Sequence, residues 1–276
     1  EREEYQDAHL MASLKELKQR RKSTQSILKV TSAMKMISAG KLKKSQDSMV
    51  RARPYSAKIK EVMQMLVYGA EKFTSAFFIR RPGNRTLYVV ITSDRGLCGG
   101  FNASIIKTFL ALYRDGDSVI AVGNKIVSAL ERRGIEAVSL HRNAFADLDF
   151  ALAAAVGDEI VRQYLSNKAD RVVLIYNRFE SALSQIVMRE QLLPVELERR
   201  ELAAGKFMNT QMSTEPDPGA LFDQMFPRYV NFLIWRGMLE SHASENAARM
   251  TTMDSATENA RDMLGRFTLE INKARQ

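Results

Sequence analysis

The pattern of small and apolar residues is most regular at the C-terminal end of the chain. From Asp217 to Gln276 the sequence predicts one long helix, with Asp217 as its N-cap and Pro218 as its first helical residue. Along it, seam residues recur at steps of three and four, a period typical of a left-handed coiled coil. These positions are Ala243, Asn246, Met250, Met253, Thr257, Ala260, Leu264, Phe267, Ile271 and Ala274. A helix of about sixty residues extends roughly 88 Å, so we expect it to leave its own domain and to need a partner helix.

The N-terminal part of the chain carries a second narrow apolar stripe. Ser13 is the candidate N-cap, and helical composition continues over 12–73. Pro54 predicts an end or a bend, with a shorter helix over 55–72 after it. The stripe consists of Leu14, Leu17, Ile27, Val30, Met34, Ile37, Leu42 and Met49. Because a narrow stripe occurs at each end of the chain, we expect the two terminal helices to pair, antiparallel if the middle of the chain forms a compact domain.

Between residues 86 and 195 short apolar runs alternate with amphipathic segments. Continuous β-branched runs indicate strands that are buried on both faces, and the segments between them indicate helices. The expected strands are 87–92, 118–122, 135–140, 171–177 and 184–195, and the expected helices are 102–113, 124–133 and 147–165. Strands that alternate with helices imply a parallel-type sheet with helices on its faces. The chain is therefore predicted to combine a coiled coil (11–73 and 217–276) with a small α/β domain (86–195).

Composition narrows the class of protein. The hydrophobic content of 45% is enough for a packed core. The one cysteine, Cys98, excludes an internal disulfide framework and fits a reducing compartment. The sequence has no apolar run of 18 residues and no secretory signal, so it predicts no membrane span. Residues 1–10 are polar and precede Met11, which resembles a natural start, so we interpret them as an upstream extension or a tag remnant.

The positive charge is concentrated in one segment. The net charge of the chain is +9, whereas residues 12–60 carry 14 Lys and Arg against Glu16 and Asp47, a balance of +12. A basic helix can face nucleic acid, an anionic membrane or an acidic protein partner, or it can simply be solvated. Since no aromatic residue is interleaved between residues 12 and 53, an acidic protein partner is favoured over nucleic acid.

One short motif has the position of a phosphate-binding loop. Residues 93–102 (SDRGLCGGFN) lie between the first predicted strand and the first predicted helix of the α/β domain. The spacing G-x-x-G-G matches neither a dinucleotide fingerprint nor a phosphate loop that ends in Gly-Lys-Ser/Thr. We therefore favour a tight, glycine-dependent turn over a nucleotide site.

The remaining candidate chemistry is weak. Cys98 would need a nearby base to act as a nucleophile, and the three histidines, His9, His141 and His242, are scattered along the sequence. A buried small residue is the favoured interpretation of Cys98. His242 and Glu245 share one helix face, but without further ligands this spacing indicates solvated helix surface rather than a metal site. The sequence predicts no catalytic residue, no metal site and no cofactor.

Three stretches of the sequence together resemble one protein family. They are 29–46 with the runs KVTSAMKMISA and KLKKSQ, 93–99 with SDRGLCG, and 244–276 with SENAARM, MDSATENA and NKARQ. From residue 11 to residue 276 the chain resembles the gamma subunits of F-type ATP synthases. This resemblance implies long antiparallel N- and C-terminal helices with a Rossmann-like α/β domain between them.

The resemblance also implies a function and a set of partners. The coiled coil would be the shaft inside a ring of three alpha and three beta subunits. The α/β domain would be the foot on the c-ring, beside the epsilon-type subunit (delta and epsilon in mitochondria). Ion flow would turn this rotor, and nucleotide chemistry would belong to beta, so the chain would be a non-catalytic subunit without a cofactor. It would be peripheral on the cytoplasmic face of a bacterial plasma membrane, or on the matrix face of the mitochondrial inner membrane.

Five residues match family positions that contact the catalytic ring. Lys29 and Met34 correspond to residues that face the acidic lever of beta. Arg249, Arg275 and Gln276 correspond to residues that contact the beta catch loop and the surrounding sleeve. The alternative for each of the five is an ordinary place on the helix surface or in the seam.

The chain departs from the family pattern in two places. It stops at Gln276, before the Gly-Ala-rich tip that sits in the apical bearing, and this puts bearing contacts in doubt. The chloroplast-type insertion with two regulatory cysteines is absent, so thiol switching of that kind is not expected.

Two other classes of function stay open from the residues alone. One is a nucleotide-binding α/β protein with helical dimerisation arms, which would bind ATP or NAD tightly. The other is a basic coiled-coil protein that binds nucleic acid, which would show a steep salt dependence of its DNA affinity.

Overall fold

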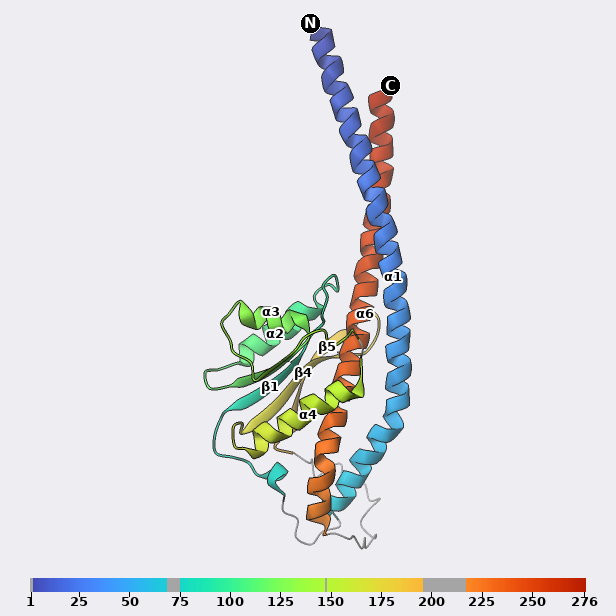
Figure 1. The fold of residues 1–276 in the computed structure, drawn as a ribbon. Helices are drawn as coiled ribbons and strands as arrows, with labels where there is room; N and C mark the ends of the chain where they lie inside the picture. The colour runs from blue at the N-terminus through green and yellow to red at the C-terminus, as the bar shows by residue number, and fades with distance from the viewer. Residues whose placement is uncertain (1, 69–74, 147, 196–216) are drawn as a thin grey trace.

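Two long helices lie side by side in the computed structural model, and an α/β domain packs against one part of them (Figure 1). The structure describes residues 2–68, 75–146, 148–195 and 217–276. Helix α1 spans Arg2–Tyr68 and helix α6 spans Pro218–Arg275. Both chain ends lie at the same far end of the pair in Figure 1, so the two helices are antiparallel, as predicted. We call the sheet domain, residues 86–195, the foot, and the α1–α6 pair the shaft.

Side-chain contacts between α1 and α6 confirm the antiparallel pairing. As residue numbers rise along α1, the numbers of their partners in α6 fall. The contacts are Thr31 with Thr257, Lys35 with Asp254, Ser45 with His242 and Tyr55 with Phe232. The predicted start of α6 is also confirmed, because the Asp217 carboxylate accepts hydrogen bonds from the backbone N–H groups of Gly219 and Ala220.

The predicted seam of α6 is confirmed along its whole length. All ten positions are buried or half-buried, while most of their neighbours beyond Met250 are exposed. The buried ones include Met253, Thr257, Ala260 and Ile271. The 3.5-residue period therefore identified the face of α6 that meets α1.

The stripe predicted for α1 is partly wrong. Ile27, Val30 and Ile37 are 51%, 57% and 61% exposed. The buried seam of α1 is instead formed by Leu42 and by four residues with hydroxyl side chains. These hydroxyl residues are Thr24, Thr31, Ser38 and Ser45.

Small hydroxyl side chains suit this seam for two reasons. They let the two helices approach closely, and their hydroxyl groups bond to carbonyls of their own helix. Thr31 Oγ1 lies 3.1 Å from the carbonyl oxygen of Ile27, and Ser45 Oγ lies 3.0 Å from that of Lys41. Polar groups satisfied in this way can be buried at little cost. The prediction for α1 relied on its large apolar residues, and several of these lie on a face of the helix next to the one that meets α6.

The ends of α1 also differ from the prediction. The helix begins at Arg2 and not at Ser13, since residues 2–12 contain no glycine or proline and extend the helical run. Pro54 lies inside the helix, so α1 does not end there and no separate helix begins after it. The ribbon bends in its light-blue part (Figure 1), as expected where proline removes one backbone hydrogen bond.

The foot is a five-stranded sheet with the order β3-β2-β1-β4-β5. Its parallel strands are β1 (Thr86–Ile91), β2 (Ser118–Val122), β3 (Ser139–His141) and β4 (Arg171–Phe179). The edge strand β5 (Gln185–Leu193) is antiparallel to β4, which the prediction of a parallel-type sheet did not specify. A 3-10 turn, η1 (Ala76–Phe78), precedes β1.

Helices cover both faces of this sheet. Helices α2 (Phe101–Leu112) and α3 (Asn124–Glu131) pack in the core of one face. Helix α4 (Phe150–Leu165) and the lower half of α6 pack in the core of the other. The expected helix over 147–165 begins at Phe150, after Asp149, and residue 147 lies outside the described residues.

The expected strand over 135–140 is shorter than predicted. Before Ser139 one backbone hydrogen bond, from Val138 N to Val119 O, joins this segment to β2, and the regular ladder begins at Ser139. The predicted irregular segment over 196–216 lies outside the described residues.

The core of the foot includes both terminal helices. Ile59, Met63 and Leu66 of α1 belong to the same buried cluster as the sheet and α6. A Cβ added at Gly237 of α6 would lie 3.2 Å from Leu174 of β4, so the helix axis runs close against the sheet. The foot and the base of the shaft therefore share one hydrophobic core.

Candidate functional site

The turn between β1 and α2 has a tightly constrained backbone and lies against α6. Leu97 and Gly99 both have positive φ, 61° and 54°. Ser93 Oγ donates a hydrogen bond to the carbonyl oxygen of Arg95 at 2.6 Å, and Ser93 N donates to Asn102 Oδ1 at 3.0 Å. A Cβ at Gly99 would lie 3.1 Å from Thr252 Oγ1 of α6. The turn is therefore tight and glycine-dependent, as predicted.

Cys98 in this turn is a buried thiol, as predicted. Its side chain is 1% exposed, and Asn102 Nδ2 donates to its sulfur at 3.1 Å. Burial raises the pKa of the Cys98 thiol, which disfavours the nucleophilic thiolate. The nitrogen Nδ1 of His242 lies 2.6 Å from Ser45 Oγ and so has a partner other than Cys98. Among the residues described, no histidine is therefore placed to act as a base for the Cys98 thiol.

Arg249 connects α6 to the turn from inside the protein. The residue is 8% exposed, and its guanidinium donates to the carbonyl oxygen of Gly96 at 3.1 and 3.3 Å. The same group forms an ion pair with Glu245 Oε1 at 2.6 Å. Burial raises the pKa of the Glu245 carboxyl, while the charge of Arg249 opposes that rise. The resemblance to the family implied that Arg249 contacts another subunit, whereas in this structure its side chain bonds within the chain.

A second set of contacts joins the turn to both long helices. Asp94 accepts from Asn124 N at 3.1 Å and from Phe145 N at 2.8 Å. The ring of Phe145 stacks on His242 of α6, with centroids 5.7 Å apart and planes at 8°. His242 in turn bonds to Ser45 of α1. We call this set the joint: the turn 93–100, residues 142–146, and α6 from His242 to Arg249.

His242 was expected on a solvated helix surface, and this expectation is wrong. Burial lowers the pKa of His242 to about 4, and the positive charge of Lys41 adds to that effect. The imidazole is therefore neutral at physiological pH. Within the ranges that the structure describes, no cluster of His, Cys, Asp or Glu could hold a metal ion.

A cavity of about 470 Å³ lies beside the joint, between α1 and the turn. Met34, Ile37 and Lys41 of α1 form one side of it, and Leu97 and Glu245 line it from the foot and α6. The lining is mixed in charge, and α1 contributes the apolar Met34 and Ile37 as well as the charged Lys41. Such a lining suits contact with side chains better than an enclosed small-molecule site.

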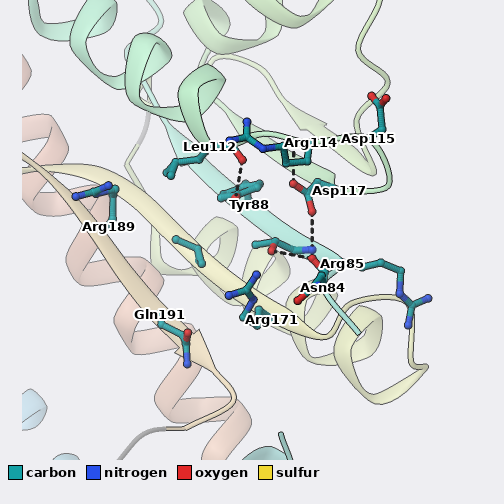
Figure 2. Close-up of a pocket in the computed structure, with 12 residues that line it drawn as sticks. Asn84, Arg85, Tyr88, Leu112, Arg114, Asp115, Asp117, Arg171, Arg189 and Gln191 are labelled. Carbon is teal, nitrogen blue, oxygen red and sulfur yellow. Dashed lines mark hydrogen bonds between the residues drawn. The ribbon is translucent and has the colours of Figure 1, made fainter. Parts of the chain in front are cut away.

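A second hollow, of about 700 Å³, lies at the opposite edge of the sheet (Figure 2). Figure 2 shows Arg171 of β4 and Arg189 of β5 near this hollow, with Asp117 across from them. Asp117 is engaged in local structure, since it accepts from Thr86 N and Arg114 N, both at 2.8 Å. The hollow is therefore a basic surface, and no nucleophile paired with a base lines it among the residues described. Sequence reasoning did not find it, because its arginines come from separate strands.

The structure separates the five residues predicted to contact other subunits. Lys29 is exposed on α1. Met34, on the same helix, is half-buried and lines the joint cavity. Arg275 and Gln276 are exposed at the far end of α6, and Arg249 is buried in the joint. Sequence reasoning missed Asp94 and Phe145, while the i, i+4 spacing of Glu245 and Arg249 was a signal that could have identified their pair.

Comparison with known proteins gives a consistent family. The family model described as ATP synthase matches residues 13–276. The ATP synthase gamma chain of Chlorobaculum tepidum is 39% identical over 276 residues, which covers 96% of this chain and 94% of that one. The ATP synthase gamma chain of Geobacter sp. (strain M21) is 40% identical over 272 residues, with coverages of 96% and 93%.

Solved structures give the same result. A chain from the central stalk and c-ring structure of the Tetrahymena thermophila mitochondrial ATP synthase is 30% identical, with a TM-score of 0.65 and coverages of 82% and 99%. A chain from the rotor of the Euglena gracilis mitochondrial ATP synthase has a TM-score of 0.70 at 19% identity and shows the same fold. In the described part of this chain, no helix is both long and apolar enough to span a bilayer.

Proposed function

The chain belongs to the family of ATP synthase gamma chains, and from this membership we propose that it is the central rotor shaft of an F-type ATP synthase. It couples ion-driven rotation of a c-ring to ATP synthesis or hydrolysis in the alpha and beta subunits. The chain itself is non-catalytic. The observation that carries the proposal is the shape of α6, which is buried in the foot at one end and forms a two-helix rod at the other.

This shape suits the transmission of torque. The base of α6 lies in the core of the foot, so a force on the foot acts on the helix without an intervening hinge loop. Beyond the joint, α1 is the element that pairs with α6, and the rod stays thin because two helices form it, with small residues such as Thr31, Thr257 and Ala260 in their seam. A thin rod fits inside a ring of subunits, whereas a thicker bundle would need a wider bore.

We propose a ring of three alpha and three beta subunits as the partner of the shaft. The basic balance of residues 12–60 and the exposed Lys29 support an acidic surface on that partner. The apolar residues Ile27, Val30 and Ile37, exposed in the isolated chain, support a contact that covers this side of α1. The c-ring and an epsilon-type subunit are proposed as partners of the foot.

Four of the five residues chosen from the sequence stay in the proposed contact set. Lys29 and Met34 would face the lever of beta, and the exposed side chains of Arg275 and Gln276 would contact the sleeve. Arg249 was chosen with them for its position, but its hydrogen bonds to Gly96 and Glu245 support an internal role.

We propose a peripheral location at the membrane through the c-ring. The bacterial relatives favour the cytoplasmic face of a plasma membrane over the matrix face of a mitochondrial inner membrane.

The first experiment is to purify this chain from its source with its partners and to measure the native mass of the complex. One copy with three of each of two nucleotide-binding subunits is the expected result. A free monomer or homodimer that binds ATP or NAD tightly would overturn the proposal.

The contact set is tested in the purified complex. Arg275→Ala should lower the torque or the ratio of ions pumped to ATP hydrolysed, because it removes a charge at the end of the shaft. Arg228→Ala is the matched control, since Arg228 is an exposed arginine near the base of the same helix. If both variants keep wild-type coupling, Arg275 leaves the contact set.

A further inference from the structure

We propose that Arg249 is a positioning residue that fastens the β1–α2 turn of the foot to the shaft and so holds Leu97 in its outward position. Its consequence for rotation rests on the proposed function. The structural part of the proposal concerns this chain alone and is tested on it alone.

The guanidinium of Arg249 is placed to act as a clamp. Its Nε and Nη2 atoms both donate to the carbonyl oxygen of Gly96, and Nη2 also lies 3.5 Å from that of Arg95. These acceptors are backbone atoms of the turn, so the bonds fix the path of the chain and not a mobile side chain. Because Arg249 is 8% exposed, water competes little for these bonds.

Glu245 holds the clamp in place. It lies one helical turn before Arg249 on α6, is 6% exposed, and binds the guanidinium through Oε1 at 2.6 Å. Its second oxygen, Oε2, is buried without a hydrogen-bond partner among the described residues. Arg249 is the cation that bonds directly to this buried carboxylate, so the two side chains act as a unit.

The turn needs such a support because Leu97 is held in an unfavourable conformation. Leu97 has a φ of 61°, a backbone angle that residues other than glycine rarely adopt. The residue is also 61% exposed. Burial of its own side chain therefore does not hold it in place. Two anchors hold the turn instead. Asp94 accepts backbone N–H groups from Asn124 and Phe145 on one side, and Arg249 donates to Gly96 on the other.

The anchored turn brings the foot to α1. Leu97 lines the joint cavity opposite Met34 and Ile37, and Ile37 is 61% exposed. Without Arg249 the turn would lose the hydrogen bonds that tie it to α6, and it would keep those within the foot, such as the bonds of Asp94 and Ser93. In the assembled rotor the hydrogen bonds from Arg249 to the turn would add to the shared core as a second link between foot and shaft.

The first test measures amide hydrogen exchange in the isolated full-length chain. Arg249→Met combined with Glu245→Gln replaces the ion pair by two neutral side chains, and methionine at position 249 has no N–H group to donate to Gly96. Exchange of the Ser93 and Phe101 amides, which bond to Asn102 Oδ1 and to the carbonyl oxygen of Cys98, should rise by about tenfold as the turn loosens. Exchange in β1 and in the α6 seam should stay as in the wild-type chain.

Further variants keep this test decisive. Arg249→Lys preserves the charge but cannot donate in a fork, so it should raise exchange in the turn while the chain stays folded. Arg228→Ala is the control on the same helix and should leave the turn protected. Unchanged exchange of the Ser93 and Phe101 amides in folded Arg249→Lys and in the double variant would overturn the proposal.

The second test measures ATP-driven ion pumping per ATP hydrolysed in the assembled complex. The double variant should lose coupling, Arg249→Lys should recover part of it, and Arg228→Ala should behave as wild type. A loosened turn with full coupling would overturn the functional part of the inference. If the wild-type chain itself showed no coupling, the rotor proposal would fail, while the exchange result would still decide the role of Arg249.

Discussion

The two halves of α6 are one continuous helix in two different surroundings. In the lower half no residue from Val230 to Arg249 is exposed, because the sheet, α4 and α1 enclose the helix. In the upper half, beyond Met250, only the seam positions are buried, and the outer face carries exposed residues such as Leu269. The secondary structure is the same, so the difference lies entirely in what packs against it.

This comparison shows how one helix can be both an anchor and a lever. The lower half is stabilised by a core with many neighbours, whereas the upper half depends on one partner helix and one narrow seam. Helical stability in proteins comes mainly from tertiary packing, so the two halves should respond differently to matched substitutions.

The largest expected difference is for isoleucine truncation. Ile234 is 0% exposed in the lower half, and Ile271 is 6% exposed in the upper seam. Ile234→Ala should lower the free energy of unfolding by about 2–5 kcal/mol, because the enclosed core cannot collapse around the cavity. Ile271→Ala should lose less than about 2 kcal/mol, since the end of a two-helix rod can relax. Urea denaturation measures both losses, and equal losses would contradict the comparison.

The next effect concerns His242, in the lower half of α6. The pKa of His242 is about 4 in the folded chain against 6.5 as its ordinary value. The unfolded state therefore binds the proton more tightly, so this contribution to stability is present above pH 6.5 and is lost as the pH falls toward 4. The loss should approach about 3 kcal/mol.

Denaturation of wild type and of His242→Gln across this pH range measures the effect. The variant should lose less stability on acidification than the wild type does. His141 also has a pKa that burial lowers, but it is present in both proteins, so the difference between them reports on His242. Parallel stability curves would contradict the assignment.

The smallest pair of effects should have opposite signs. A Cβ at Gly157 of α4 would lie 1.9 Å from Asn231 Oδ1 and 3.0 Å from Asn231 Cα in the lower half of α6. Gly157→Ala should therefore destabilise by about 1–3 kcal/mol. Gly265 in the upper half has nothing within 4 Å of such a Cβ. Gly265→Ala should stabilise by up to about 1 kcal/mol, because alanine favours helix over glycine. Melting temperatures measure both, and equal signs would contradict the comparison.

The sequence by itself determined the features that depend on local order along the chain. The period of the α6 seam, the Asp217 cap and the strand over 118–122 were predicted with the observed residues. Periodicity and capping are properties of neighbouring residues, so they can be recognised without a partner. The same holds for the tight turn at Gly99.

Tertiary structure decided which faces and which side chains meet. The apolar residues of α1 suggested one face, but contact with α6 selected the hydroxyl residues, such as Thr31, whose groups are satisfied within their own helix. Pro54 predicted an end or a bend, and the chain bends without ending the helix. Arg249 had the sequence context of an exposed helix residue, yet the approach of a turn about 150 residues earlier in the chain made it an internal clamp. Burial and partners are set by segments distant in sequence, and for this reason only the folded chain could assign them.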